Sequence, residues 1–440
     1  MAYRSFDDIA LDRRALLRSG ALFGGGALLA GSPLAAAFAK VSASSAQWPA
    51  VSAMIEQYVA ARRVANMVAT LGWGQKAPDT IARGSLAIGQ PEPAGSDSLY
   101  RIYSMTKPIT GMAAMILIDE GKLRLDQPIA ELLPAYAKMR VLKSPTGPVE
   151  ETVAAERPIT VRHLLTHTAG LGYNVVSKGP IKALYERTGL LPGQVSRIAL
   201  PGFGDYATIE GLGAFATTLA RVPLVYQPGT KWSYSVSLDL LGRVIEIAAK
   251  TPFDRFLQQR IFEPCGMAST WFTVPQSEVG RFTTNYGVLN GVPLPIDPAR
   301  ASIYLDEPAF PFGGAGLVSS PRDYDRFLMM LAGLGAIGGK RVMSEKAVRL
   351  GTSNLLPAGV STKGTFADGG GFGAGGRSQG GNYGWGGAAG TVAFVNIGLG
   401  LRGNLMTQYM PAEAYPVHSA FPAAVLKDVA VMMPAKKVAA

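Results

Sequence analysis

The chain has 440 residues, of which 48% are hydrophobic, and this length and composition predict two or three structural units with a packed core and exclude an intrinsically disordered chain. A single cysteine excludes an internal disulfide, and three histidines without any C-x-x-C motif argue against a structural zinc site. The net charge is +11, but lysine and arginine are scattered without long runs, so we expect no nucleic-acid partner and at most transient contact with anionic envelope surfaces.

Residues 1–39 are typical of a twin-arginine export signal. Arg13 and Arg14 precede an uncharged stretch from residue 19 to 39 that ends in a small-x-small site. The alternative is an uncleaved membrane anchor, which five glycines and a proline within the stretch disfavour. We therefore expect cleavage after Ala39 and an exported, periplasmic protein.

The next segments predict strands followed by a buried helix. Residues 63–73 and 79–88 alternate or run apolar around a glycine-containing turn, which is typical of two antiparallel strands. Residues 112–118 form a continuous apolar run that Asp-Glu-Gly closes, which predicts a buried helix with a C-terminal stop. From about 120 to 300, helical patterns such as 238–249 alternate with loops rich in proline and glycine.

Ser104-Met105-Thr106-Lys107 is the only S-x-x-K motif in the chain. Pro108 suits a first helical turn, so Ser104 is expected at a helix N-terminus with Lys107 one turn later on the same face. The helix dipole would act on the hydroxyl, and the lysine could take or stabilise its proton. The alternative is an N-cap serine beside a surface lysine.

Two further segments carry candidate functional residues. Tyr234 lies in Trp-Ser-Tyr-Ser-Val-Ser ahead of a helical run, and a neighbouring lysine cation would favour its phenolate as a general base. Taken alone, such a tyrosine is more often a packed aromatic residue. Residues 383–391 combine aromatic bulk with glycines that let backbone N–H groups approach a substrate.

Twelve glycines lie between residues 364 and 387, a density that suits a flexible linker. Tyr383, Trp385 and the apolar run 391–397 instead indicate strands joined by a glycine-rich turn. Strands would then lie at both ends of the chain with helices between them, so the two ends must pair in one sheet.

Ser378 is a rival nucleophile, because residues 376–380 satisfy G-x-S-x-G. In an α/β-hydrolase that motif needs an apolar strand before it and a helix after it, and the glycine-rich flanks provide neither. We therefore prefer Ser104.

Taken in order, the three segments resemble the serine β-lactamase and penicillin-binding superfamily, and in particular the family-eight carboxylesterases that are similar to class C β-lactamases. Residues 159–171 resemble the family's I-T-I-R-H-L-L-T-H-T-S-G-L segment, and residues 312–317 resemble its G-G-A-G-L turn. The resemblance extends from about residue 50 to 410.

The resemblance implies an α/β (α+β) fold of the β-lactamase/transpeptidase type, with an antiparallel sheet flanked by helices and a mostly helical domain. We expect residues 40–118 and 305–440 to build the sheet domain and residues 119–304 the helical one. The resemblance assigns the catalytic roles to Ser104, Lys107 and Tyr234, and His163 and His167 fall in a scaffold motif and are expected to be structural. The oxyanion hole would comprise the N–H groups of Ser104 and Ala388, and the substrate site would include Trp385, Gly386, Gly387 and Val236.

Two departures from the β-lactamase pattern favour an esterase. Val236 replaces the asparagine that binds an acyl amide, and Trp385 replaces the lysine that meets a β-lactam carboxylate. We expect a small-molecule ester substrate and no metal or organic cofactor. The alternatives are a β-lactamase, a D-aminopeptidase or DD-peptidase, a transesterase, and, in another class, a non-catalytic relative that binds peptidoglycan or another ligand. The sequence does not indicate an oligomeric state.

Overall fold

The computed structural model describes residues 44–198 and 207–433. The residues from Ala50 onward belong to one compact unit. The predicted export signal at residues 1–39 lies outside the described residues. In the part of the chain that is described, no helix is long and apolar enough to cross a membrane.

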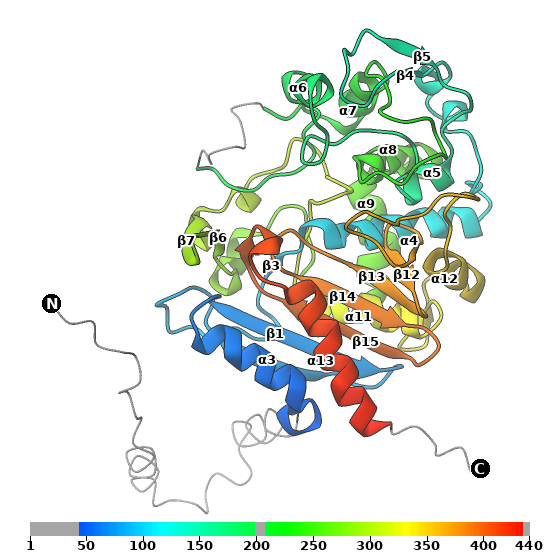
Figure 1. The fold of residues 1–440 in the computed structure, drawn as a ribbon. Helices are drawn as coiled ribbons and strands as arrows, with labels where there is room; N and C mark the ends of the chain where they lie inside the picture. The colour runs from blue at the N-terminus through cyan, green and yellow to red at the C-terminus, as the bar shows by residue number, and fades with distance from the viewer. Residues whose placement is uncertain (1–43, 199–206, 434–440) are drawn as a thin grey trace, which may run out of the picture. The chain divides into compact units, whose positions relative to one another are not determined.

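Among the described residues, seven strands form one sheet in which every neighbouring pair is antiparallel (Figure 1). In spatial order they are β11 (Gly371–Phe372), β12 (Arg377–Gln379), β13 (Asn382–Gly386), β14 (Val392–Asn396), β15 (Leu401–Met406), β1 (Asn66–Trp73) and β2 (Asp79–Gly84). The pairing of β1 with β15 joins the two ends of the chain, as the sequence predicted. The strands expected at 63–73 and 79–88 are confirmed as β1 and β2.

Helices α3 (Pro49–Ala60) and α13 (Val417–Met432) lie on one face of this sheet (Figure 1). Phe421 of α13 packs against Phe394 of β14, with 6.1 Å between the ring centroids. The buried carboxylate of Asp428 accepts hydrogen bonds from the N–H groups of Ala50 and Val51 in the first turn of α3. A carboxylate is favourable there because the first N–H groups of a helix lack partners within the helix.

Helices α4 (Thr106–Asp119) and α11 (Pro321–Ala332) pack on the opposite face, and α12 (Glu345–Thr352) packs on α4. Residues 106–117 of α4 are all buried, which fits a helix that is apolar on every side. Gly111 lets α4 approach the backbone of Ala374, since a Cβ at Gly111 would lie 2.0 Å from the Ala374 carbonyl oxygen. The buried helix predicted at 112–118 is thus confirmed, and it is fixed against the glycine-rich segment.

The helices between the two ends of the sheet include α8, which packs against α4. The helix predicted at 238–249 is confirmed as α8 (Ser237–Ala249). The others are α5 (Val161–Leu165), α6 (Pro180–Arg187), α7 (Leu212–Leu219), α9 (Phe253–Leu257) and α10 (Glu263–Cys265). The smaller strands are β3 (Tyr100–Arg101), β4 (Arg140–Leu142), β5 (Thr152–Ala154), β6 (Asn285–Leu289), β7 (Val292–Asp297), β8 (Val318–Ser319), β9 (Ala336–Ile337), β10 (Lys340–Arg341) and β16 (Tyr409–Met410). The domain boundaries that we expected at 118 and 305 stay a prediction.

The glycine-rich segment 364–387 contains strands, as the aromatic residues in it predicted. It supplies β11, β12 and β13, so it forms the edge of the sheet beside α4. Gly375, Gly380 and Gly381 take positive φ angles of 74°, 56° and 80°, which glycine adopts at little cost. The glycines therefore serve tight turns between short strands.

Candidate active site

Ser104 lies in a short 3₁₀ turn, η2 (Tyr103–Met105), that leads directly into α4. It was expected at a helix N-terminus, and it lies two residues before Thr106, the first residue of α4. Tyr103 before it has a φ of 41°, an uncommon value for a residue with a Cβ. The buried Tyr103 side chain accepts a hydrogen bond from Asn285 Nδ2 at 3.2 Å, and this contact helps to hold the strained turn.

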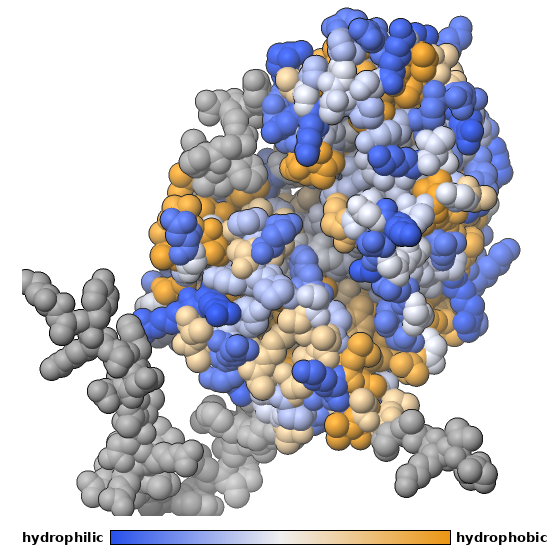
Figure 2. Space-filling model, in the orientation of Figure 1, coloured by the Kyte–Doolittle hydropathy of each residue, from blue (hydrophilic) through white to orange (hydrophobic). Residues whose placement is uncertain are grey.

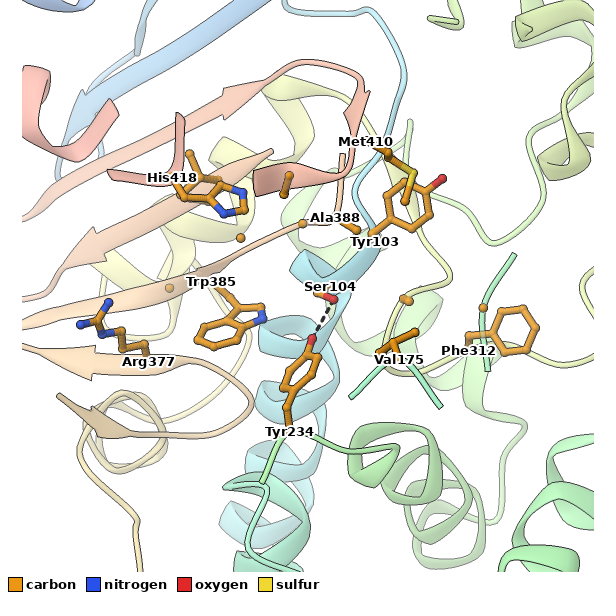
Figure 3. Close-up of a pocket in the computed structure, with 18 of the residues that line it drawn as sticks. Tyr103, Ser104, Val175, Tyr234, Phe312, Arg377, Trp385, Ala388, Met410 and His418 are labelled. Atoms are coloured by element: carbon orange, nitrogen blue, oxygen red, sulfur yellow. Dashed lines mark hydrogen bonds between the residues drawn. The ribbon is translucent and has the colours of Figure 1, made fainter. Parts of the chain in front are cut away.

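Three of the predicted residues meet at one oxygen atom. Lys107 Nζ donates a hydrogen bond to Ser104 Oγ at 3.1 Å, and the Tyr234 hydroxyl donates to the same atom at 2.7 Å (Figure 3). Lys107 Nζ also lies 4.6 Å from the centre of the Tyr234 ring. Ser104 is partly exposed and Lys107 is buried, so the hydroxyl faces the cavity with its proton acceptors beside it. This geometry suits an activated serine nucleophile.

Asp239 is a buried carboxylate next to this group that the sequence analysis did not single out. It accepts a hydrogen bond from the N–H of Gly314 at 2.8 Å, and the carbonyl of Gly314 accepts one from Lys107 Nζ at 2.7 Å. Burial raises the pKa of Asp239 to about 7, and the positive charge of Lys107 opposes this rise. A lone acidic residue within the apolar run 238–241 was the signal that could have identified it.

Aromatic rings surround Tyr234 and fix its direction toward Ser104. The ring centroids of His167, Phe366 and Trp385 lie 4.7, 5.3 and 5.9 Å from that of Tyr234. Tyr173 packs on it at 5.8 Å. The phenol is thus held on several sides while its hydroxyl donates to Ser104 Oγ.

The two histidines of the segment 159–171 lie outside the cavity lining. His163 completes a capping box with Thr160 at the start of α5. The buried His167 ring accepts a hydrogen bond from the Ser235 N–H at 3.2 Å, and burial together with Lys107 lowers its pKa well below the usual value. The His167 ring contacts the side of Tyr234, and neither histidine bonds to Ser104.

The C-terminal end of β13 forms one wall of the cavity. Trp385, Gly386, Gly387 and Ala388 all line it, as predicted for the third segment. A Cβ on Gly387 would lie 2.4 Å from the carbonyl oxygen of Ile102, so only glycine fits where this strand meets the nucleophile turn. The N–H of Ala388 donates to no acceptor among the described residues, and it remains available to a ligand.

Val236 does not line the cavity. Its side chain is fully buried in the hydrophobic core, where it precedes the first turn of α8. The prediction that it forms part of the substrate site finds no support in this placement. The physical reason is that an apolar side chain at this position gains more from packing in the core than from facing a hydrated cavity.

Ser378 lies in β12, paired with strands on both sides, and its Oγ donates to the Thr352 carbonyl at 2.8 Å. No strand-to-helix elbow is present there. Arg377, from the same strand, lines the cavity, but Figure 3 shows Trp385 between it and Ser104, with the guanidinium pointing away. One of its nitrogen atoms donates to the Asp368 carbonyl.

Ser104, Tyr234, Trp385 and Ala388 line a cavity of about 1920 Å³ that is open to solvent. Figure 2 shows the surface hollowed between the sheet and the helices above it, with hydrophobic side chains on the rim. The reacting groups and the free N–H of Ala388 face this hollow together. Such an arrangement can form an acyl-enzyme and stabilise the oxyanion that develops in its formation.

The amino-acid sequence is similar to those of several known proteins. A family model described as Beta-lactamase matches residues 51–425. Protein Rv1367c of Mycobacterium tuberculosis is 38% identical over 264 residues, which cover 60% of this chain and 61% of that protein. This chain therefore spans about three fifths of the length of that relative. Esterase EstB of Burkholderia gladioli is 29% identical over 383 residues, which cover 81% of this chain and 89% of that protein.

A solved structure shares the fold. EstCE1, described as a hydrolase with promiscuous acyltransferase activity, superposes with a TM-score of 0.69 over 88% of this chain and 99% of its own, at 24% sequence identity. The expected α/β architecture with an antiparallel sheet and flanking helices is thereby confirmed.

Proposed function

Because the chain belongs to the β-lactamase family, we propose that it is a serine carboxylesterase that cleaves small acyl esters through an acyl-enzyme on Ser104. The family contains hydrolases with esterase and acyltransferase relatives. The observation that carries the proposal is that Ser104 Oγ lies 3.1 Å from Lys107 Nζ and 2.7 Å from the Tyr234 hydroxyl. Both are groups that can accept a serine proton in their basic form.

The proposed reaction has two steps. Ser104 Oγ attacks the ester carbonyl while its proton passes to the Lys107–Tyr234 pair, and the N–H groups of Ser104 and Ala388 stabilise the oxyanion. The C–O bond to the alcohol then breaks, and the pair returns the proton to the departing alkoxide. Water repeats the sequence on the acyl-enzyme, releasing the acid and restoring the Ser104 hydroxyl.

Trp385 supports an ester rather than a β-lactam as the preferred substrate. Its indole lines the cavity wall at the position where the resemblance places a lysine. A β-lactam carboxylate would lose water there without gaining a cation, and a buried charge without a partner is costly. An uncharged ester has no such group.

A second candidate function is acyl transfer to an alcohol. The cavity is wide and open, so an alcohol other than water could reach the acyl-enzyme. EstCE1 is described as having promiscuous acyltransferase activity, which supports this alternative. Both functions use the same acyl-enzyme, and the acceptor alone distinguishes them.

Trapping the acyl-enzyme tests the proposal. The protein is mixed with p-nitrophenyl butyrate or a fluorophosphonate, quenched in acid and digested, and the modified residue is located by mass spectrometry. We expect the adduct on Ser104, its loss in Ser104→Ala together with a fall in kcat of several orders of magnitude, and its persistence in the matched variant Ser378→Ala. A label on Ser378, or equal losses in both variants, would contradict the proposal.

A further inference from the structure

Tyr234 lies in a segment without regular secondary structure. Residues 231–235 belong to no helix or strand, and α8 begins at Ser237. The hydrogen bonds of a helix or a sheet therefore do not hold this backbone. The Tyr234 hydroxyl nevertheless meets Ser104 Oγ at 2.7 Å, as Figure 3 shows. Contacts from other parts of the chain must fix its position.

One residue, His167, binds the backbone on both sides of Tyr234. The carbonyl oxygen of His167 accepts a hydrogen bond from the N–H of Ser233 at 2.9 Å. The ring Nδ1 of His167 accepts another from the N–H of Ser235 at 3.2 Å. The main chain and the side chain of His167 thus hold the residue before Tyr234 and the residue after it.

The hydrogen bonds of the His167 ring are directed to Ser235. Nδ1 also lies 3.0 Å from Ser235 Oγ, which in turn lies 2.7 Å from the Oγ of Ser237 at the start of α8. A backbone N–H can only donate, so Nδ1 acts as the acceptor and carries no proton in this arrangement. The other ring nitrogen, Nε2, is buried and has no hydrogen-bond partner among the described residues.

The backbone of His167 has an uncommon conformation. His167 follows the short helix α5 with a φ of 55°, a value that histidine and asparagine adopt more often than most residues other than glycine. In this conformation its carbonyl and its ring nitrogen both face the segment 233–235. The ring is fully buried, and its centroid lies 4.7 Å from that of Tyr234 and 5.5 Å from that of Phe372.

His167 does not contact the reacting atoms. It does not line the cavity and it does not bond to Ser104. An effect of His167 on the reaction must therefore pass through Tyr234. Proton transfer needs the two groups at hydrogen-bond distance, and a misplacement of about 1 Å can cost about a hundredfold in rate.

We propose that His167 is a positioning residue, which holds the Tyr234 hydroxyl at Ser104 Oγ by binding the backbone on both sides of Tyr234. This inference rests on the proposed function of Ser104. Because His167 lies outside the cavity lining, its loss should change kcat and leave KM almost unaltered.

Two substitutions of similar shape test the role of the ring acceptor. Asparagine places Oδ1 where Nδ1 lies and tolerates a positive φ, whereas leucine has a similar shape but no acceptor. With p-nitrophenyl butyrate we expect His167→Leu to lower kcat by about 10 to 100 times while KM stays within about twofold of wild type. His167→Asn should keep kcat within about threefold of wild type, because the acceptor is restored. An equal loss of kcat in the two variants would overturn the inference.

His163→Leu is the matched control. His163 Nδ1 also accepts a backbone hydrogen bond at 3.2 Å, from Thr160, but it caps α5 instead of binding a neighbour of Tyr234. We expect a lower melting temperature for this variant, because a cap is lost, and the kcat of the wild type. An equal fall in kcat in His163→Leu and His167→Leu would overturn the inference.

The same substitution in the Tyr234→Phe background shows whether His167 acts through the Tyr234 hydroxyl. If it does, adding His167→Leu there should change kcat by at most about twofold, because the two effects are coupled. The same loss in both backgrounds, or the kcat of the wild type in His167→Leu, would overturn the inference. Should His167→Leu not fold, His167→Gly takes its place, since glycine adopts this φ without strain and also lacks the ring acceptor.

Failure of the proposed function would be distinguishable from these outcomes. In that case the wild type would hydrolyse no ester, or Ser104→Ala would keep its activity.

Discussion

Ser104 Oγ receives two hydrogen bonds from groups that are themselves within 5 Å of each other. Lys107 Nζ lies 4.6 Å from the centre of the Tyr234 ring. A cation at that distance interacts favourably with the face of the ring. Because both groups bond to Ser104 Oγ, the proposed mechanism uses them together.

We predict that Lys107→Ala and Tyr234→Phe each lower kcat by a factor of about 10² to 10⁴, the usual contribution of a general base. The kcat of the double variant should be at most about tenfold below that of the less active single variant, because groups that act as a unit give non-additive losses. Steady-state kinetics on a butyrate ester measures this, and thermal melting serves as the control for folding. Losses that multiply would show that the two residues serve separate steps.

Because Asp239 is buried, we expect the free energy of unfolding of the protein to depend on pH. Its pKa is about 7 in the folded protein, against 3.8 when exposed. Between pH 4 and pH 7 the carboxyl group of Asp239 therefore keeps its proton in the folded protein but has lost it in the unfolded chain. Its contribution to the free energy of unfolding is largest below about pH 4 and is lost as the pH rises to 7.

We predict that the free energy of unfolding of the wild type, relative to Asp239→Asn, falls by up to about 1.4 kcal/mol per pH unit across that window. Asparagine retains an acceptor for the Gly314 N–H, so the turn should persist. Urea denaturation at pH 4, 5, 6 and 7 measures the difference. As a control, Asp126→Asn should show the opposite sign at low pH, because hydrogen bonds from Arg162 lower the pKa of Asp126. A difference that is constant with pH would contradict the prediction.

At the scale of elements, the site depends on how closely α4 approaches the glycine-rich edge of the sheet. Gly111 of α4 faces the Ala374 backbone, and Gly375 next to it donates a backbone hydrogen bond to the Leu165 carbonyl at 3.0 Å. The segment that follows leads through β12 to Trp385 and the candidate oxyanion hole. The spacing between α4 and this segment therefore sets the distance from Ser104 to the opposite wall.

We predict that Gly111→Ala destabilises the protein by about 1 to 3 kcal/mol. The added Cβ would lie 2.0 Å from a carbonyl oxygen, and this clash exceeds the gain of up to about 1 kcal/mol in helix propensity. Activity should fall as well, because the segment leading to β13 must move. Gly280→Ala is the control: no atom lies within 4 Å of the new Cβ, so we expect a change within about 0.5 kcal/mol. Equal melting temperatures for the two variants would contradict this.

At the scale of the whole molecule, the cavity joins side chains from distant parts of the chain. Ser104 precedes α4, Tyr234 precedes α8, and Ala388 follows β13. Arg377 lines this cavity but is turned away from Ser104 (Figure 3). We therefore expect substrate preference to depend on residues from several elements that line the cavity together.

We predict that kcat/KM for a short aryl ester exceeds that for a cephalosporin by about a hundredfold or more. Val236 is buried in the core and supplies no amide to the lactam amide, and Trp385 supplies no cation to the lactam carboxylate. Loss of these two partners costs together about 3 kcal/mol. Hydrolysis of p-nitrophenyl butyrate and of a chromogenic cephalosporin under the same conditions measures the ratio. A ratio of one or below would contradict the ester preference, and Arg377→Ala would then show whether that cation binds the lactam.

The sequence determined the local features of this protein by itself. The apolar run after Ser104 and Lys107 predicted a buried helix, and the alternation at 63–73 and 79–88 predicted two strands, because burial and backbone geometry impose those periods on neighbouring residues. Aromatic residues among the glycines of 364–387 indicated strands for the same reason. The S-x-x-K spacing predicted that Ser104 and Lys107 lie side by side one turn apart, and their hydrogen bond of 3.1 Å agrees with this.

The tertiary structure alone decided which distant residues share the site. Asp239 gains its role from Gly314, 75 positions away, and Val236 faces the core although its neighbour Tyr234 faces the nucleophile. Local periodicity shows that a residue is buried but not what it is buried against, because that contact depends on how the separate elements pack.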